Sequence, residues 1–201
     1  GVGTSARIVD KLVGCTATHL LVSAVRGSIG LMIIETSRSG VTLGQLHPEN
    51  AECYATLLRD NHAHLTRLGD YKDEVATPAA EYARQFAING PALAFAIYEA
   101  EAMVGSVALV AVDPPKYGLG YWLAANACGR GLATLAVEAA VTYAARELLA
   151  TDVFAGVTHG NDRSVAVLER AGFRGVADFD DYSRYHIDLG NIETDKPRSG
   201  D

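Results

Sequence analysis

Cysteine is scarce in this 201-residue sequence, and the three that occur, Cys15, Cys53 and Cys128, lie far apart without a C-x-x-C pair. An odd number at such spacing excludes a disulfide framework and a cysteine-rich zinc site, and it favours a reducing compartment. A membrane-spanning run is also lacking, because the apolar stretch 20–34 is short and contains Arg26. We therefore expect a cytoplasmic protein with no metal and no membrane contact.

Basic residues are fewer than acidic residues. The sequence has 17 basic and 24 acidic side chains, which gives a formal net charge of -7 and an isoelectric point near 5.3. The basic footprint of a nucleic-acid-binding protein is missing, so we expect no nucleic-acid partner and a substrate that is cationic, if charged. The length and the 49% hydrophobic content fit a single domain that buries roughly 70% of its unfolded surface.

The chain divides into three parts. Residues 1–40 are rich in Val, Ser, Thr and Gly with weak periodicity, and we expect an N-terminal extension of unknown role without chemistry. Such a segment could add a strand to a neighbouring copy and make a homodimer. Residues 41–189 have the regular patterns of a folded domain, and residues 190–201 form a polar tail.

Hydrophobic periodicity predicts a mixed α/β domain within residues 41–189. Its order is β, α, α, β, β, β, α, β, α, β, β. We expect strands at 41–46, 92–99, 103–112, 117–123, 153–158, 173–178 and 184–189, and helices at 48–59, 77–90, 132–144 and 162–171. The segment 61–73 is expected to be a loop or an irregular helix.

The sharpest local feature is the glycine-rich segment 128–134, between an expected strand and the strongest expected helix. Its backbone N–H groups and the positive end of the helix dipole would bind a phosphate, and Arg130 or Thr134 could add donors. A simple tight turn is the alternative. The segment matches neither a dinucleotide fingerprint nor a P-loop, because the third small residue and a G-K-[ST] triplet are both absent.

Two ordered motifs in this context resemble the GCN5-related N-acetyltransferase (GNAT) family, in its RimJ/RimL-like branch. The first is Asn126-Ala127-Cys128-Gly129-Arg130-Gly131, which follows the strand block Gly120-Tyr121-Trp122-Leu123. The second runs from Val157 to Asn161 and continues through Ser164, Leu168-Glu169-Arg170 and Gly172-Phe173. The resemblance covers roughly residues 41–189.

This resemblance implies a GNAT fold, in which a mostly antiparallel sheet contains a splayed pair of parallel strands and is flanked by helices. Acetyl-CoA would lie between strands 117–123 and 153–158. The resemblance implies that main-chain groups of Trp122, Leu123 and Ala124 hold the pantetheine and the acetyl oxygen. It implies that backbone N–H groups hold the pyrophosphate, those of Cys128, Gly129, Arg130, Gly131, Leu132 and Ala133, with Thr134 as a further donor. Asn161 would also bind near the cofactor.

The resemblance also implies the reaction. A primary amine, of a small molecule or of a protein N-terminus, would attack the thioester directly, and backbone N–H groups would stabilise the tetrahedral oxyanion. No acyl-enzyme is required, so we expect Cys128 to have a packing role. Ser164 is the candidate proton or hydrogen-bond donor to the departing thiolate, with a solvent-facing helical serine as the alternative. Asn161 would bond near the cofactor, cap the following helix, or do both.

Three positions depart from the family pattern. Leu168 replaces a tyrosine acid, Gly118 replaces a glutamate base, and Asn126 replaces a glutamine or arginine. An ammonium must still lose a proton, and His159, at the end of its strand, is the candidate base.

Weaker candidates for the base are also present. They are Tyr121, Glu99, Asp180 and Asp181. His62 and His64 could shape substrate entry, although an exposed polar loop is the favoured interpretation there.

Two other functions stay open. One is an aminoacyl-tRNA-dependent transferase on the same fold, which the acidic balance disfavours. The other is a non-catalytic acyl-CoA-binding regulatory module. Gly118 and Leu168 suit this interpretation because they stand where relatives have the base and the acid.

Overall fold

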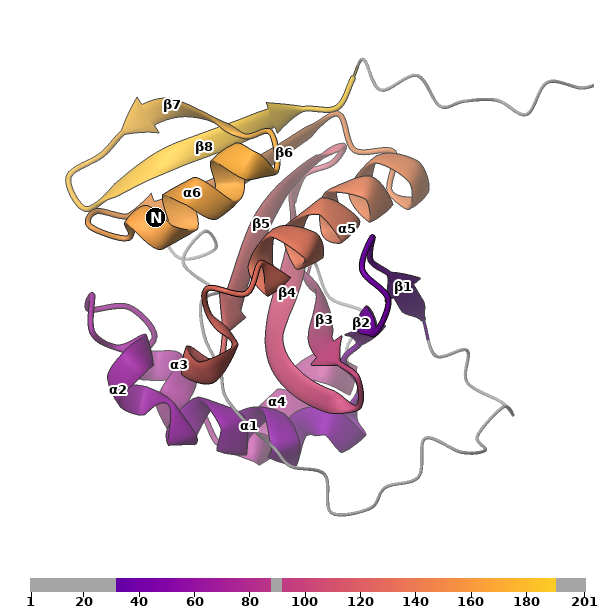
Figure 1. Ribbon diagram of the computed structural model, residues 1–201, viewed down its shortest axis with the longest axis vertical. Coiled ribbons are helices and arrows are strands. Elements are labelled where there is room, and N and C mark those ends of the chain that lie inside the picture. The colour runs from indigo at the N-terminus through magenta and orange to yellow at the C-terminus, as the bar shows by residue number, and fades with distance from the viewer. Residues whose placement is uncertain (1–31, 88–91, 191–201) are drawn as a thin grey trace, which may run out of the picture.

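The computed structural model describes residues 32–87 and 92–190, where eight strands form one sheet in the order β1-β2-β3-β4-β5-β6-β8-β7 (Figure 1). The strands are β1 (Ile33–Glu35), β2 (Val41–Gln45), β3 (Ala92–Glu99), β4 (Ala102–Asp113), β5 (Lys116–Leu123), β6 (Asp152–Thr158), β7 (Arg174–Asp178) and β8 (Tyr182–Asp188). All neighbours are antiparallel except β5 and β6, which are parallel. The expected mixed sheet is confirmed.

Helices cover both faces of this sheet. One face carries the 3₁₀ turn η1 (Pro48–Asn50) and helices α1 (Ala51–Asp60), α2 (His62–Leu65), α3 (Lys72–Ala76) and α4 (Ala79–Ala87). The other face carries α5 (Leu132–Glu147) and α6 (Asp162–Arg170), and η2 (Ala125–Ala127) links β5 to α5. Each layer encloses its own core, because successive strand residues point to opposite faces. Val107 packs under α5, whereas Trp122 packs under α1.

The parallel pair β5 and β6 is joined over only part of its length. Pairing runs from Lys116 with Asp152 to Gly118 with Phe154 and then stops, although both strands continue. The carboxyl halves therefore diverge and leave a gap in the sheet, which the following loops and helices border. Carboxyl ends of parallel strands at such a break are where open α/β sheets bind ligands.

The expected elements agree with the structure to within a few residues. Segment 61–73 contains the short helix α2 and the start of α3, and the expected helix end near Asn89 lies outside the described residues. The one strand not expected is β1, which pairs with β2 of the same chain, so the sheet begins before Val41. Residues 1–31 and 191–201 of the proposed extension and tail also lie outside the described part.

Two features are absent from the described residues. None of the helices in 32–87 and 92–190 has the length and apolar character needed to cross a membrane. Within the same ranges, no three His, Cys, Asp or Glu side chains are grouped to hold a metal ion.

Candidate active site

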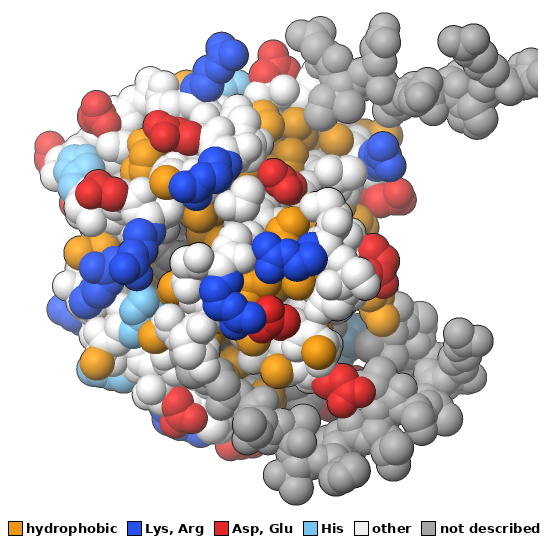
Figure 2. All heavy atoms as spheres, in the orientation of Figure 1, with side chains coloured by type: hydrophobic (Ala, Val, Ile, Leu, Met, Phe, Trp, Pro, Cys, Tyr) orange, Lys and Arg blue, Asp and Glu red, His pale blue; other side chains and the backbone are white. Residues whose placement is uncertain are grey.

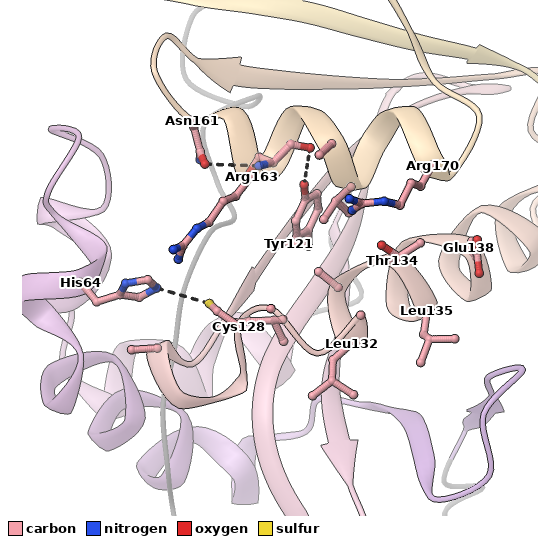
Figure 3. A pocket seen from close by; sticks show the side chains of 18 of the residues that line it. His64, Tyr121, Cys128, Leu132, Thr134, Leu135, Glu138, Asn161, Arg163 and Arg170 are labelled. Atoms are coloured by element: carbon pink, nitrogen blue, oxygen red, sulfur yellow. Dashed lines mark hydrogen bonds between the residues drawn. The ribbon is translucent and has the colours of Figure 1, made fainter.

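A cavity of about 880 Å³ opens between α5, α6 and the diverging end of β5. Residues from five separate segments line it: Arg38; His64, Arg67 and Leu68; Tyr121, Leu123 and Ala125; 128–129 and 131–135 with Glu138; and Asn161, Arg163, Ser164, Ala166, Val167 and Arg170. Figure 3 shows Tyr121 in the middle, with His64 towards one end and Arg170 and Thr134 towards the other. All of these residues belong to one chain.

The loop before α5 brings backbone N–H groups to this cavity. Gly129 and Gly131 have φ values of 75° and 79°, a left-handed conformation that side-chain-bearing residues rarely adopt. Gly131 is the N-cap of α5, and the first-turn N–H groups of a helix have no partner within the helix. The start of α5 thus has the backbone geometry that anion binding at a helix N-terminus requires, and the binding itself stays a prediction.

Most residues expected to bind the cofactor line the cavity, but three do not. Trp122 and Ala124 are buried, with the Trp122 side chain packed on the α1 side of the sheet. Only their backbone could serve, as the expectation for this strand end required. Arg130 forms an ion pair with Glu99 of β3 and does not line the cavity.

Arg38 is a cavity residue that the sequence analysis missed. It lies in the turn between β1 and β2, and its Nη2 donates to the carbonyl oxygen of Arg130 over 3.0 Å. The guanidinium also lies 3.2 Å from where a Cβ on Gly131 would be. The expectation that residues 1–40 take no part in the site is therefore wrong at this position.

The lining of the cavity is strongly basic. Arg38, Arg67, Arg163 and Arg170 contribute four guanidinium groups, against the single carboxylate of Glu138. In the described part of the chain, no carboxylate pairs with any of the four. Figure 2 shows basic side chains gathered over the middle of this face. Although the protein has a net charge of -7, positive charge is concentrated at this cavity, which favours an anionic ligand.

Asn161 and Ser164 both lie at the cavity wall. The Asn161 side chain accepts from the Ser164 N–H over 3.3 Å, so its expected capping role is confirmed. Ser164 is only 8% exposed, and its carbonyl oxygen accepts from the Tyr121 hydroxyl over 3.0 Å (Figure 3). The alternative of a solvent-facing serine is wrong, because α6 turns this position towards β5.

The histidines are placed differently from expectation. His159 is exposed in the turn after β6, where its N–H donates to the carbonyl oxygen of Asp181, and it does not line the cavity. Gly160, the next residue, has a φ of 83°, so the chain turns sharply directly after His159. His64, assigned to an exposed loop, instead lines the cavity with its Nε2 3.7 Å from the Cys128 Sγ.

Cys128 is held in place by the loop around it. Its Sγ donates to the carbonyl oxygen of Ala124 over 3.1 Å, and the thiol is half-buried at the cavity wall. These contacts agree with the expected packing role.

The opposite face of β5 is supported by an aromatic cluster. Tyr54 of α1 packs edge-on against Trp122, Tyr82 and Phe86, with ring centroids 5.6, 4.8 and 5.1 Å away. Burial raises the pKa of the Tyr54 hydroxyl to about 12, while hydrogen bonds from Trp122 and Ser106 lower it in part. This cluster fixes the strand end that precedes the cavity.

Comparison with known proteins agrees with this geometry. The sequence profile of the acetyltransferase (GNAT) domain matches residues 41–174. A Bacillus subtilis protein provisionally named the ribosomal N-acetyltransferase YdaF is 30% identical over 145 residues, which cover 66% of this chain and 77% of that protein.

Solved structures show the same fold at low sequence identity. The ribosomal L7/L12 α-N-protein acetyltransferase RimL, in complex with coenzyme A, is 21% identical, with a TM-score of 0.70 over 79% of this chain and 99% of that chain. RimJ of Mycobacterium smegmatis, in complex with CoA-disulfide, is 20% identical, with a TM-score of 0.66 over 82% and 90%. The protein profile, the relative and the shared fold give one conclusion: this chain belongs to the GNAT family of acetyl-CoA-dependent N-acetyltransferases.

Proposed function

We propose that this acetyltransferase modifies the α-amino group of a protein or peptide, with acetyl-CoA held in the basic cavity. The observation that carries the cofactor assignment is the set of four arginines that line the cavity and that pair with no carboxylate among residues 32–87 and 92–190. Acetyl-CoA carries a pyrophosphate and a further phosphate, which match guanidinium groups and helix N–H donors. The names of YdaF, RimL and RimJ relatives support a protein N-terminus as the acceptor.

The residues divide this work by position. The 128–134 loop and Arg38 would hold the pyrophosphate, while Arg170 of α6 serves the outer phosphate. Leu123 and the backbone of the β5 end would border the acyl-bearing arm, near Asn161. Backbone N–H groups there would stabilise negative charge that develops on the thioester oxygen during attack.

Ser164 is the proposed donor to the departing thiolate. It is buried at the cavity wall between α6 and β5, and its backbone is fixed by Asn161 and Tyr121. A fixed, water-poor hydroxyl can donate without reorganisation, which is what a leaving group needs. His159 would need a rearrangement of its turn to take part, so no proton transfer is assigned to it.

A cytoplasmic location is part of this proposal, because protein N-termini of the ribosomal type are modified there. A dimer is not required for the cavity, since one chain supplies all of its described lining.

The test is calorimetric titration with acetyl-CoA, followed by a CoA-release assay with three acceptors. These are a peptide with a free N-terminus, the same peptide with that N-terminus blocked and an internal lysine free, and spermidine. We expect micromolar binding and turnover with the first acceptor alone. Turnover with spermidine alone would replace the protein acceptor by a small amine, and binding without turnover on any amine would indicate a regulatory module.

A further inference from the structure

The segment from α2 to α3, residues 61–71, crosses the open end of the gap between β5 and β6. On one side it contacts the cofactor loop: the Asn61 Oδ1 lies 3.5 Å from the Ala125 N–H that donates to it, and His64 lies against Cys128. Figure 1 shows the loop between α2 and α3 rising from the α1–α4 layer towards β6 and α6. The same segment therefore contacts the loop that follows β5 and extends towards β6.

Its far end is tied to β6 through Asp70. The Thr158 hydroxyl donates to the Asp70 Oδ1 over 3.0 Å, at the last residue of β6. The neighbours of Asp70 fix its position, because Gly69 has a φ of 88° and the buried Tyr71 has a φ of 67°. A left-handed conformation at a tyrosine is costly and persists where the surroundings over-determine it.

Asp70 bonds a residue that points away from α5, whereas His64, Arg67 and Leu68 of the same segment line the basic cavity. Along β6, Val153, Ala155 and Val157 are buried in the core under α5, so Gly156 and Thr158 point to the other face. The carboxylate that bonds Thr158 therefore borders the gap from the α1–α4 side. Gly120 of β5 and Gly156 of β6 lie where the two strands diverge, and neither has a side chain that could fill the gap.

The Asp70 carboxylate has unused bonding capacity. Thr158 occupies one oxygen, and among residues 32–87 and 92–190 no basic group or hydrogen-bond donor is paired with the second. Asp70 is only partly exposed, in contrast to the fully solvated Asp73 on the next helix. A fixed carboxylate of this kind binds an ammonium group through charge-assisted hydrogen bonds.

We propose that Asp70 binds the ammonium group of the acceptor at the entrance to the gap between β5 and β6. This inference rests on the proposed function, since acetyl-CoA would fill the cavity on the α5 side and leave the gap as the acceptor's approach. A primary amine is an ammonium ion at neutral pH. It releases its proton to solvent before its lone pair forms the C–N bond and the C–S bond breaks, with CoA leaving as thiol. Asp70 is thus a specificity residue for cationic acceptors.

The test compares Asp70→Asn with Asp73→Asn, which removes an equal charge from an exposed position three residues away. The Asn side chain keeps an oxygen for Thr158. Two acceptors are used: a peptide with a free N-terminus, and 2,2,2-trifluoroethylamine, which is largely uncharged at neutral pH. For Asp70→Asn we expect the peptide KM to rise about 10-fold or more, with the acetyl-CoA affinity and the trifluoroethylamine kcat/KM within about 2-fold. Asp73→Asn should match the unchanged protein.

Three results would overturn the inference. An equal loss with both amines would make Asp70 a structural tie, and a loss of acetyl-CoA affinity would place its role on the cofactor side. If the peptide KM of Asp70→Asn is no higher than that of Asp73→Asn, then Asp70 does not contact the ammonium group. If the unchanged protein binds acetyl-CoA but acetylates no amine, the proposed function fails and the role of Asp70 fails with it. If the unchanged protein acetylates the peptide and Asp70→Asn has the same peptide KM, only the inference about Asp70 is refuted.

Discussion

An added methyl group at Gly105 of β4 should destabilise the protein. Gly105 pairs with Leu123 of β5, and a Cβ built on it would lie 2.3 Å from the Trp122 carbonyl oxygen and 2.8 Å from the Leu123 Cδ2. The first of these is a backbone atom, so relief requires movement of the whole strand end. Overpacking of this kind costs typically about 1–3 kcal/mol, and we expect Gly105→Ala to lie at about 3 kcal/mol.

Gly118 of β5 provides the matched control. A Cβ there would meet its nearest atom, the Val112 Cγ2, at 3.6 Å, which is an ordinary contact. Since glycine within a strand is destabilising by roughly 0.5–1 kcal/mol relative to alanine, Gly118→Ala should leave stability unchanged or raise it by about that amount. The two variants make the same chemical change on paired strands, and their free energies of unfolding should differ by about 3 kcal/mol or more.

Urea unfolding followed by circular dichroism measures this difference, with equal m-values as the check that both variants unfold alike. Gly105→Ala should also weaken acetyl-CoA binding, because the displaced Leu123 lines the cavity. Equal stability of the two variants would refute the reasoning, since it would show that the end of β5 yields to a 2.3 Å contact without cost.

Three further outcomes are expected. Ser164→Ala should lower kcat about 100-fold in a CoA-release assay while the calorimetric affinity for acetyl-CoA stays the same, and an unchanged kcat would remove the serine from the reaction. Arg170→Gln should weaken acetyl-CoA binding about 10-fold at low salt and less at high salt, whereas Arg174→Gln, on exposed β7, should not. Hydrogen bonds from Thr151 and then from His186 lower the pKa of the Asp152 carboxyl in the folded protein. The carboxylate therefore stabilises the folded state fully at pH values above its unfolded-state pKa, and this stabilisation is lost as the pH falls through its lower folded-state pKa. Asp152→Asn should therefore flatten the acid side of the stability profile measured by urea unfolding.

The fold was largely predictable because its signals are local. The glycine pair before α5, the apolar hairpin of β3 and β4, and the periodicity of α5 each depend on neighbouring residues. The strand β1 was missed because three residues carry no detectable alternation, and its pairing with β2 stabilises it instead. Short strands are set by their partners more than by their own sequence.

The candidate site was predictable only where the backbone makes it. The cofactor loop was found from its glycines, but the four cavity arginines come from three separate segments, at 38, at 67 and at 163–170. Because these arginines are spread along the chain, no single stretch of the sequence is rich in basic residues. His64 lines the cavity and His159 does not, which their positions in the sequence did not indicate, because the end of a strand does not show where the following turn places a side chain.

The charge distribution would let an acidic protein hold both an anionic cofactor and the proposed cationic acceptor. The net charge of -7 is an average over the chain, whereas Arg38, Arg163 and Arg170 line the cavity on the α5 side, Arg67 reaches it from the segment 61–71, and none of the four pairs with a carboxylate among the described residues. Asp70 bonds Thr158 on the other side of the sheet, and no donor of the described part is paired with its second oxygen. Because the gap separates the two signs, each substrate would meet complementary charge on its own face, and like-charge repulsion would discourage either from entering the other's side.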